Sequence, residues 1–271
     1  MSHFALSCTT CALRGWGDNE TLDTFRHAPK AGYRYWGSAE SVLRTAELAL
    51  WADVARMKRG ASEAGLLGIT EVYADGFPPA TVEQAVAHAA SLAGVARAAV
   101  KMGSPLLVFT GSRPRKEGHL EATIAGLQAL LPLIAEMPIR VALEPHFGST
   151  VQFAEDYDAI LGAIDDPKLG ITVDVGHFHA AGVDWEGLIR RYPKRIYNVH
   201  LKDQVGRQSV PIGEGEIDLC RLIRVLDELD YSGALAVELE VVDPENLPAY
   251  CARAHTVLSG LVYEVTGEYP D

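Results

Sequence analysis

Apolar runs typical of β-strands alternate with helical patterns along the whole chain. Eight short runs are rich in β-branched, aromatic or leucine residues and end in polar clusters, as strands do. They cover residues 4–9, 33–37, 68–74, 105–110, 139–146, 170–177, 195–203 and 234–240. Helical patterns lie between and after them, at residues 20–31, 39–65, 81–102, 118–136, 152–165, 184–191, 217–230 and 244–264.

Eight strand–helix units in one chain predict an α/β fold, a single (β/α)8 TIM barrel. The structural rival is a doubly wound open sheet, which would carry a glycine-rich turn after its first strand if it bound a dinucleotide. The first loop has Gly15 and Gly17 but lacks a third glycine at the required spacing. No linker interrupts the alternation, so we expect one barrel domain over residues 1–271.

Composition and charge exclude several classes of function. The 271 residues include 24 basic and 36 acidic side chains, a net charge of −12, which disfavours nucleic acid and anionic membranes as partners. No apolar run approaches the ~18 residues of a membrane span, and the first residues lack the basic region of a signal peptide. Four cysteines form no disulfide framework. These features predict a cytoplasmic protein.

Charged or ligating residues close four consecutive predicted strands, each directly after an apolar run. These residues are Glu144, Asp174, His200 and Glu238. A charge in this position is costly unless it is paired or bound to a metal, and neighbouring strands of a barrel bring their carboxyl ends together. Three carboxylates and one imidazole favour one divalent ion, Mn²⁺, Mg²⁺ or Co²⁺, with Zn²⁺ also compatible. Separate salt bridges around the rim are the structural alternative.

Five motifs at and around these residues resemble the xylose-isomerase-like barrel superfamily. The motifs are ALEPH (142–146), ITVDVGHFHAAGVD (171–184), NVHLKD (198–203), IGEGEIDL (212–219) and YSGALAVELE (231–240). The superfamily contains sugar isomerases and epimerases, inosose and 3-dehydroshikimate dehydratases and type IV apurinic endonucleases. The resemblance is strong over residues 139–241 and rests mainly on the barrel rhythm before them.

The resemblance implies that Glu144, Asp174, His200 and Glu238 are the metal ligands. It also implies that His177 lies over the substrate, and it places Arg207 near the substrate-binding arginine of the epimerases. Glu240 shares the strand face of Glu238 and is the alternative ligand from the eighth strand.

Further residues around the strand ends are candidates for substrate binding. The full predicted set is His177, Arg207, His146, Lys202, Trp36 and Trp16. Each of the last four has a structural alternative: a rim position for His146, a salt bridge with Asp203 for Lys202, and core packing for the two tryptophan rings.

Departures from the endonuclease pattern favour a site with one metal. The endonuclease branch carries an Asp-x-His pair before the IGEG motif, whereas residues 206–211 of this chain read GRQSVP. The fourth predicted strand ends in Phe109-Thr110-Gly111, where a histidine would be expected. Together with the acidic net charge, these departures argue against a role in DNA repair.

The resemblance implies a metal-dependent sugar isomerase or epimerase that works through a metal-stabilised enediolate, with Glu144 and Glu238 as the two acid/bases. A dehydratase of the inosose or 3-dehydroshikimate type shares this intermediate and is the first alternative. A non-catalytic or partner-dependent sugar-binding barrel is the second. Glutamates lie next to Gly213 and Gly215 and would repel a phosphate group, so this loop is no phosphate cradle. The expected substrate is therefore an unphosphorylated sugar or cyclitol. Barrels of this kind often pair through their faces, which leaves a homo-oligomer open.

Overall fold

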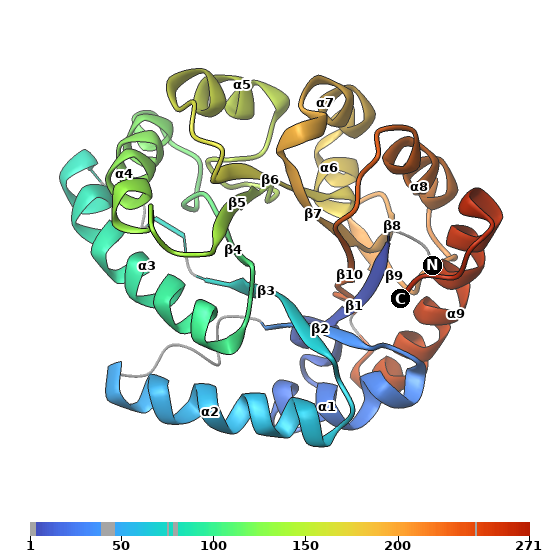
Figure 1. The fold of residues 1–271 in the computed structure, drawn as a ribbon. Coiled ribbons are helices and arrows are strands. Elements are labelled where there is room, and N and C mark those ends of the chain that lie inside the picture. Colours follow the sequence, from blue (N-terminus) through green and yellow to red (C-terminus); the bar gives the residue numbers. More distant parts are fainter. Residues whose placement is uncertain (1–3, 39–46, 75, 78–80, 242) are drawn as a thin grey trace.

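The computed structural model describes residues 4–38, 47–74, 76–77, 81–241 and 243–271 and contains a closed barrel of eight parallel strands (Figure 1). The strands follow one another around the barrel in the order β1-β10-β7-β6-β5-β4-β3-β2. They are β1 (Ala5–Thr9), β2 (Tyr35–Ser38), β3 (Gly68–Tyr73), β4 (Leu106–Thr110), β5 (Arg140–Glu144), β6 (Leu169–Asp174), β7 (Ile196–Leu201) and β10 (Ala234–Val237). The predicted (β/α)8 fold is confirmed.

Helices surround the barrel and cover the outer face of its strands (Figure 1). The α-helices are α1 (Glu20–Ala31), α2 (Glu47–Glu63), α3 (Val82–Met102), α4 (His119–Leu133), α5 (Ala154–Ala163), α6 (Val175–Ala181), α7 (Trp185–Arg191), α8 (Leu219–Glu228) and α9 (Leu247–Thr266). Short 3-10 helices are η1 (Thr10–Leu13), η3 (Pro193–Arg195) and η4 (Pro244–Asn246). Residues 39–46 of the predicted helix 39–65 lie outside the described residues.

Four predicted strands end two or more residues before their apolar runs do. The runs 139–146 and 234–240 end as strands at Glu144 and Val237, and the other two are cut short by the elements that follow them. The run 170–177 ends as a strand at Asp174, because the side chain of Asp174 accepts the backbone N–H of His177 and begins α6 there. The run 195–203 ends at Leu201, and a small antiparallel hairpin follows, formed by β8 (Asp203–Val205) and β9 (Gln208–Val210). The sequence patterns did not predict α6 or this hairpin.

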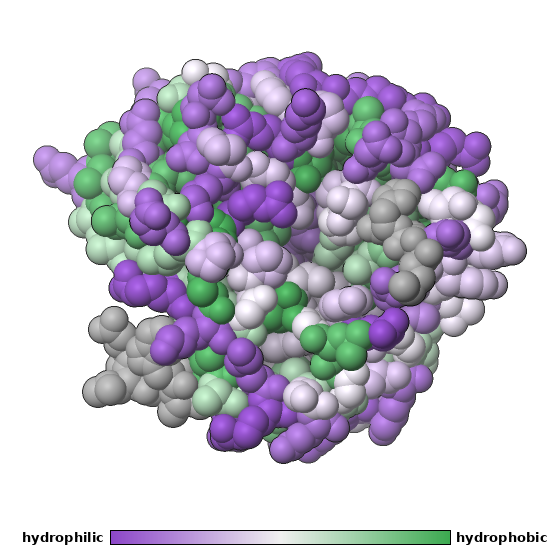
Figure 2. All heavy atoms as spheres, viewed as in Figure 1, coloured by the Kyte–Doolittle hydropathy of each residue, from purple (hydrophilic) through white to green (hydrophobic). Residues whose placement is uncertain are grey.

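Ordinary capping and burial explain the helical layer. Asn19 caps α1, and Thr81 and Gln84 form a reciprocal capping box at the start of α3. The core lies between the strands and the helices, where α3 buries a face of small alanine side chains. Figure 2 shows the face of the molecule seen in Figure 1, with hydrophilic residues over most of its outer rim. None of the described helices is long and apolar enough to cross a membrane.

The buried carboxylate of Asp203 fixes the loop after the hairpin. It accepts backbone N–H groups of Gln204, Gly213, Gly215 and Ile217 at 2.9–3.3 Å. A Cβ atom on Gly215 would overlap this carboxylate, so the loop requires glycine there. The IGEG segment is therefore held by a side chain of the strand end that precedes it.

Replacing Asp203 with alanine should leave these four N–H groups without their shared acceptor. We expect the free energy of unfolding to fall by about 3 kcal/mol, since hydrogen bonds to a charged acceptor are costly to lose. Chemical denaturation measures the change. Asp165→Ala, which removes an exposed carboxylate, is the control and should change stability little. Equal stability of the two variants would contradict the role of Asp203.

Candidate metal centre

The four residues that close the strands do converge. Glu144 ends β5, Asp174 ends β6, His200 lies in β7, and Glu238 directly follows β10. One ligand atom from each residue lies within 4.8 Å of the others. The side chains of Glu144, Asp174 and His200 are buried, and that of Glu238 is 13% exposed. We call this set the inner group.

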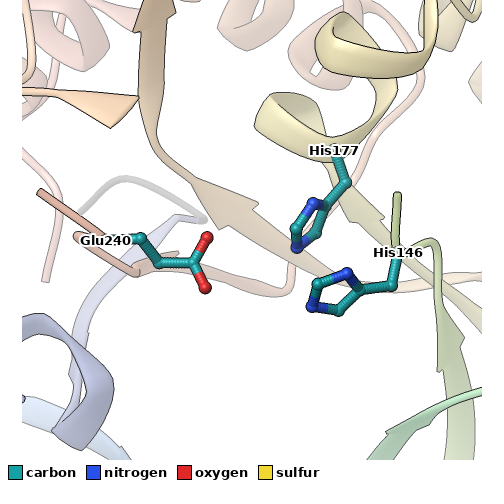
Figure 3. A group of neighbouring side chains, drawn as sticks. All are labelled: His146, His177 and Glu240. Atoms are coloured by element: carbon teal, nitrogen blue, oxygen red, sulfur yellow. The ribbon is translucent and has the colours of Figure 1, made fainter. Parts of the chain in front are cut away.

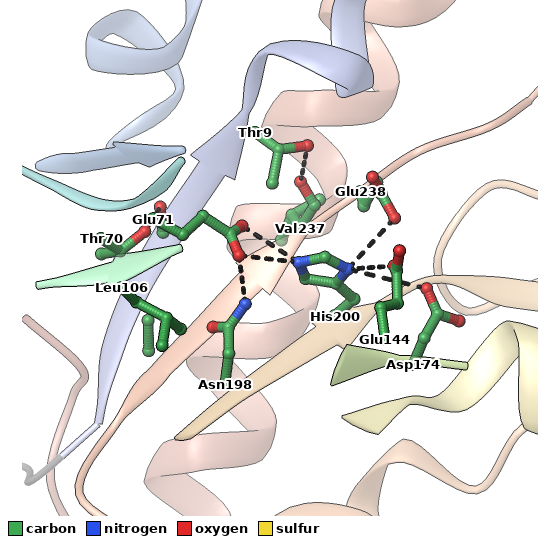
Figure 4. Close-up of polar contacts among 12 residues, drawn as sticks. Thr9, Thr70, Glu71, Leu106, Glu144, Asp174, Asn198, His200, Val237 and Glu238 are labelled. Atoms are coloured by element: carbon green, nitrogen blue, oxygen red, sulfur yellow. Dashed lines mark hydrogen bonds and ion pairs between the residues drawn. The ribbon is translucent and has the colours of Figure 1, made fainter. Parts of the chain in front are cut away.

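His200 lies at the centre of the inner group (Figure 4). Its Nδ1 atom is 2.6 Å from Glu144 Oε1, 3.3 Å from Glu238 Oε2 and 3.8 Å from Asp174 Oδ2. The other ring nitrogen, Nε2, lies 2.9 Å and 3.0 Å from the two carboxylate oxygens of Glu71. The imidazole therefore directs Nδ1 towards the three carboxylates and Nε2 towards Glu71.

Glu71 is a site residue that the sequence reasoning missed. It lies in β3 on the opposite side of the barrel, is 2% exposed, and also accepts a hydrogen bond from the Asn198 side chain. Gly37 leaves room for it, because a Cβ atom there would lie 2.9 Å from Glu71 Oε1. The available signal was a single charged residue within the apolar run 68–74. A carboxylate that accepts the second N–H of a ligating histidine fixes its tautomer and orientation.

Lys202 supplies a second buried cation beside the inner group. Its ammonium lies 2.9 Å from Asp174 Oδ2, 2.8 Å from Glu238 Oε2 and 3.0 Å from Glu240 Oε2. The predicted alternative partner, Asp203, instead binds backbone N–H groups. Lys202 therefore faces the site and does not form the strand-end pair.

The two glutamates of the inner group differ in protonation. Burial raises the pKa of Glu144 to about 8, and the carboxylates of Glu238 and Asp174 add to the rise against the opposing effect of His200. Burial alone would raise the pKa of Glu238, but Lys202 and His200 lower it well below its ordinary value. Environments that separate the pKa values of two carboxyl groups are typical of acid/base pairs.

The two cationic groups are held in their charged forms. Burial alone would lower the pKa of His200, but Glu71, Glu238 and Glu144 raise it well above its ordinary value. Burial alone would also lower the pKa of Lys202. The carboxylates of Asp174, Glu238 and Glu240 outweigh this effect and raise the pKa of Lys202 well above its ordinary value.

The predicted substrate-binding residues divide into two sets. The rings of His146 and His177 lie with their centroids 3.7 Å apart and their planes tilted by 34°, close to Glu240. Arg207, in the turn between β8 and β9, places its guanidinium 4.4 Å above the ring of Phe147, the neighbour of His146. These three predicted residues lie around the carboxyl ends of β5, β6 and β7.

The two tryptophans lie elsewhere. Trp36 is buried and packs edge-on against Phe25 of α1, with ring centroids 4.9 Å apart. Trp16 is 37% exposed and packs against His27, also of α1. The structure does not bring either ring into the inner group. The neighbour of Trp36, Gly37, lies beside Glu71 instead, because a Cβ atom on Gly37 would meet the Glu71 side chain.

The inner group fits a divalent cation. Its donors are three carboxylates and an imidazole, a mostly oxygen set that suits hard or borderline divalent ions. Asp174 Oδ2 is buried and has no hydrogen-bond partner among the described residues, although it is ion-paired with Lys202. A buried acceptor of this kind and three adjacent carboxyl groups are satisfied by a bound cation.

Comparison with known families agrees with this geometry. A family model described as the xylose isomerase-like TIM barrel matches residues 25–256. The chain therefore belongs to the xylose isomerase-like TIM barrel family, as the motifs predicted. Members of this family include enzymes named as dehydratases and epimerases.

Individual relatives are more distant. The chain is 28% identical over 153 residues to an inosose dehydratase of Clostridium perfringens, a match that covers 49% of this chain and 51% of that protein. The chain thus spans about half the length of the curated relatives it matches. Among solved structures, it resembles the IOLI protein with a bound zinc atom (TM-score 0.77, 17% identity, covering 97% and 100% of the two chains). It also resembles the D-allulose 3-epimerase of Methylomonas sp. in complex with D-allulose (TM-score 0.76, 18% identity, covering 95% and 96% of the two chains). These two similarities show the shared fold.

Glu71→Gln should lower the pKa of His200, because it removes a negative charge 2.9 Å from Nε2. NMR titration of the ring nitrogens in metal-free protein measures the shift. Asp156→Asn, which neutralises a buried carboxylate paired with Arg115, is the matched control and should leave His200 unchanged. If the pKa of His200 is the same in the Glu71 variant as in wild-type protein, Glu71 does not control the charge of this histidine.

Proposed function

We propose that the protein is a divalent-metal-dependent epimerase or isomerase of an unphosphorylated ketose or a related cyclitol ketone. The observation that carries the proposal is the pair of glutamates Glu144 and Glu238. They come from opposite ends of the arc formed by β5, β6, β7 and β10, approach the same histidine nitrogen, and differ in protonation. Such a pair can remove a proton from one side of a carbon atom and return it on the other.

The residues of the inner group would hold the cation. Glu144, Asp174, His200 and Glu238 are its proposed ligands, and Glu71 would orient His200 from behind. A bound divalent ion supplies Lewis-acid polarisation of the substrate carbonyl and its neighbouring hydroxyl. The protein's own contribution is to position the substrate carbon between the two glutamates.

The two glutamates would carry the proton transfer. With the cation bound, both would be ionised, since a metal ligand must lose its proton. Glu238 would accept the proton from the carbon next to the carbonyl, and Glu144, after taking up a proton from water, would donate it to the other face. Return to the same carbon gives an epimer, and return to the neighbouring carbon gives an aldose. His177, His146 and Arg207 would contact the remaining hydroxyl groups from the mouth of the barrel.

The preference for an unphosphorylated substrate rests on the IGEG loop. Backbone N–H groups of Gly213 and Gly215 are the donors that a phosphate would need there. Both already donate to Asp203, at 2.9 Å. The exposed glutamates between and after them, Glu214 and Glu216, would repel an anion.

Dehydration is the second candidate, favoured by the match to inosose dehydratases. In this reaction a carboxylate removes the proton from the carbon next to the ketone, and a hydroxyl group on the following carbon leaves. Lys202 is placed to give that hydroxyl a proton, so that one water is released and a double bond forms. The buried ammonium is charged and lies 2.8 Å from Glu238, which could return a proton to it.

Metal binding should release protons and strengthen as the pH rises. The metal-free protein holds protons on Glu144, with a pKa of about 8, and on His200, and a cation must displace both. Calorimetric titration of stripped protein with Mn²⁺, in buffers of different ionisation enthalpy, measures the proton release between pH 6 and pH 8. Asp174→Asn should weaken binding strongly, whereas the surface variant Glu214→Gln should not. Failure of wild-type protein to bind any divalent cation would refute the proposed function.

Incubation with ketoses and inososes in D₂O should distinguish the reactions. Deuterium at the carbon next to the carbonyl, with an epimer or aldose as product, supports the first candidate. A product that has lost water supports the dehydratase. No exchange despite bound metal would indicate a sugar-binding barrel without catalysis.

The same exchange assay tests the two glutamates. Glu144→Gln and Glu238→Gln should each reduce exchange by at least about 100-fold, the lower range of a general acid/base contribution. Asp156→Asn serves as the control for loss of a buried carboxylate. If both glutamine variants keep full exchange, the base assignment is wrong.

A further inference from the structure

A second set of metal-ligating side chains lies next to the inner group, in the segments that directly follow β5, β6 and β10. It consists of His146, His177 and Glu240, which follow Glu144, Asp174 and Glu238 by two, three and two residues (Figure 3). We call these three residues the outer group. Because they follow the carboxyl ends of the strands, they lie nearer the open end of the barrel than the inner group does.

The three side chains of the outer group face a common space. One ligand atom from each lies within 4.8 Å of the others, and Figure 3 shows the Glu240 carboxylate pointing towards the two imidazoles. His177 is only 7% exposed. Nδ1 of His146 is buried and has no hydrogen-bond partner among the described residues. Buried ring nitrogens without partners are expensive, and a ligand is one way to satisfy them.

The donor set differs from that of the inner group. Two imidazoles and one carboxylate form a nitrogen-rich, three-ligand set with open positions, which suits Zn²⁺ or Co²⁺ and not Mg²⁺.

The ammonium of Lys202 does not block this space. It donates to Oε2 of Glu240 at 3.0 Å, which leaves Oε1 for another ligand. Its charge is balanced by Asp174 and Glu238, at 2.9 Å and 2.8 Å. The contact also holds the carboxylate in place, which lowers the entropy cost of binding a cation.

We propose that His146, His177 and Glu240 form a second cation site, selective for Zn²⁺ or Co²⁺, stacked above the inner group. A cation bound there lies in the path between the open end of the barrel and the inner group. The residues that the sequence assigned to substrate binding, His146 and His177, would then hold that cation directly.

Metal stoichiometry tests the proposal without any measurement of activity. Stripped protein is equilibrated with excess Zn²⁺ or excess Mn²⁺, freed of unbound metal by gel filtration and analysed for bound metal by mass spectrometry. Wild-type protein should retain two equivalents of Zn²⁺ but one of Mn²⁺. His146→Ala, His177→Gln and Glu240→Gln should each retain one equivalent of Zn²⁺.

His179→Ala is the matched control, since His179 lies two residues from His177 in α6 but pairs with Glu216 at the surface. It should retain two equivalents of Zn²⁺. Circular dichroism confirms that each variant is folded. One equivalent of Zn²⁺ in wild-type protein that the His177 variant also retains, or two equivalents in the His177 variant, would overturn the proposal.

A double variant separates this inference from the proposed function. The double variant Asp174→Asn with Glu144→Gln removes ligands of the inner group alone. It should retain one equivalent of Co²⁺ at the outer group. The absorption spectrum of this Co²⁺ should be lost when His177→Gln is added. Wild-type protein that binds Zn²⁺ only through the outer group would refute the inner metal site and leave this proposal standing. Complete absence of bound Co²⁺ in the folded double variant would refute it.

Discussion

The need to balance buried charge governs the centre of this barrel. Four carboxylates, those of Glu71, Glu144, Asp174 and Glu238, surround two cations that alternate along one strand, His200 and Lys202. An isolated buried charge would cost many kilocalories per mole, so each charged group depends on the others. Protonation of Glu144 reduces the remaining excess of negative charge. Removing one member therefore leaves an uncompensated charge on its partners, and does more than delete a contact.

The strand geometry makes this arrangement possible. Asn198, His200 and Lys202 are separated by two residues each, so their side chains line the same side of β7 and its extension. Asn198 donates a hydrogen bond to Glu71, and His200 pairs with the carboxylates of the inner group. Lys202 pairs with Glu240 of the outer group. Gly37 provides the space that the Glu71 side chain needs on the opposite wall. One strand thus supplies three successive levels of polar contact.

Much of this could be predicted from sequence because each strand contains an apolar run and polar residues lie at its end. The alternation of apolar runs gave the barrel, and polar residues after four runs gave the inner group. Glu71 was not predicted, because its partner His200 is 129 residues away in the sequence. A lone glutamate in a strand carries no local pattern that identifies the residue it contacts. Trp36 shows the converse. An aromatic ring at a strand end resembles a pocket wall in the sequence, but Trp36 packs against Phe25 of α1, and its neighbour Gly37 lies beside Glu71. The helix α6 was missed because a single cap, the Asp174 side chain, ends the strand within an otherwise continuous apolar run.

The position of Lys202 has a thermodynamic consequence. One ammonium group is shared between Asp174 and Glu238 below and Glu240 above, so it cannot strengthen its contacts with one layer without changing the other. If both layers hold cations as proposed, occupancy of one layer would alter the affinity of the other through Lys202, and linkage requires the two effects to be equal. One side chain would then couple the two ends of this polar column.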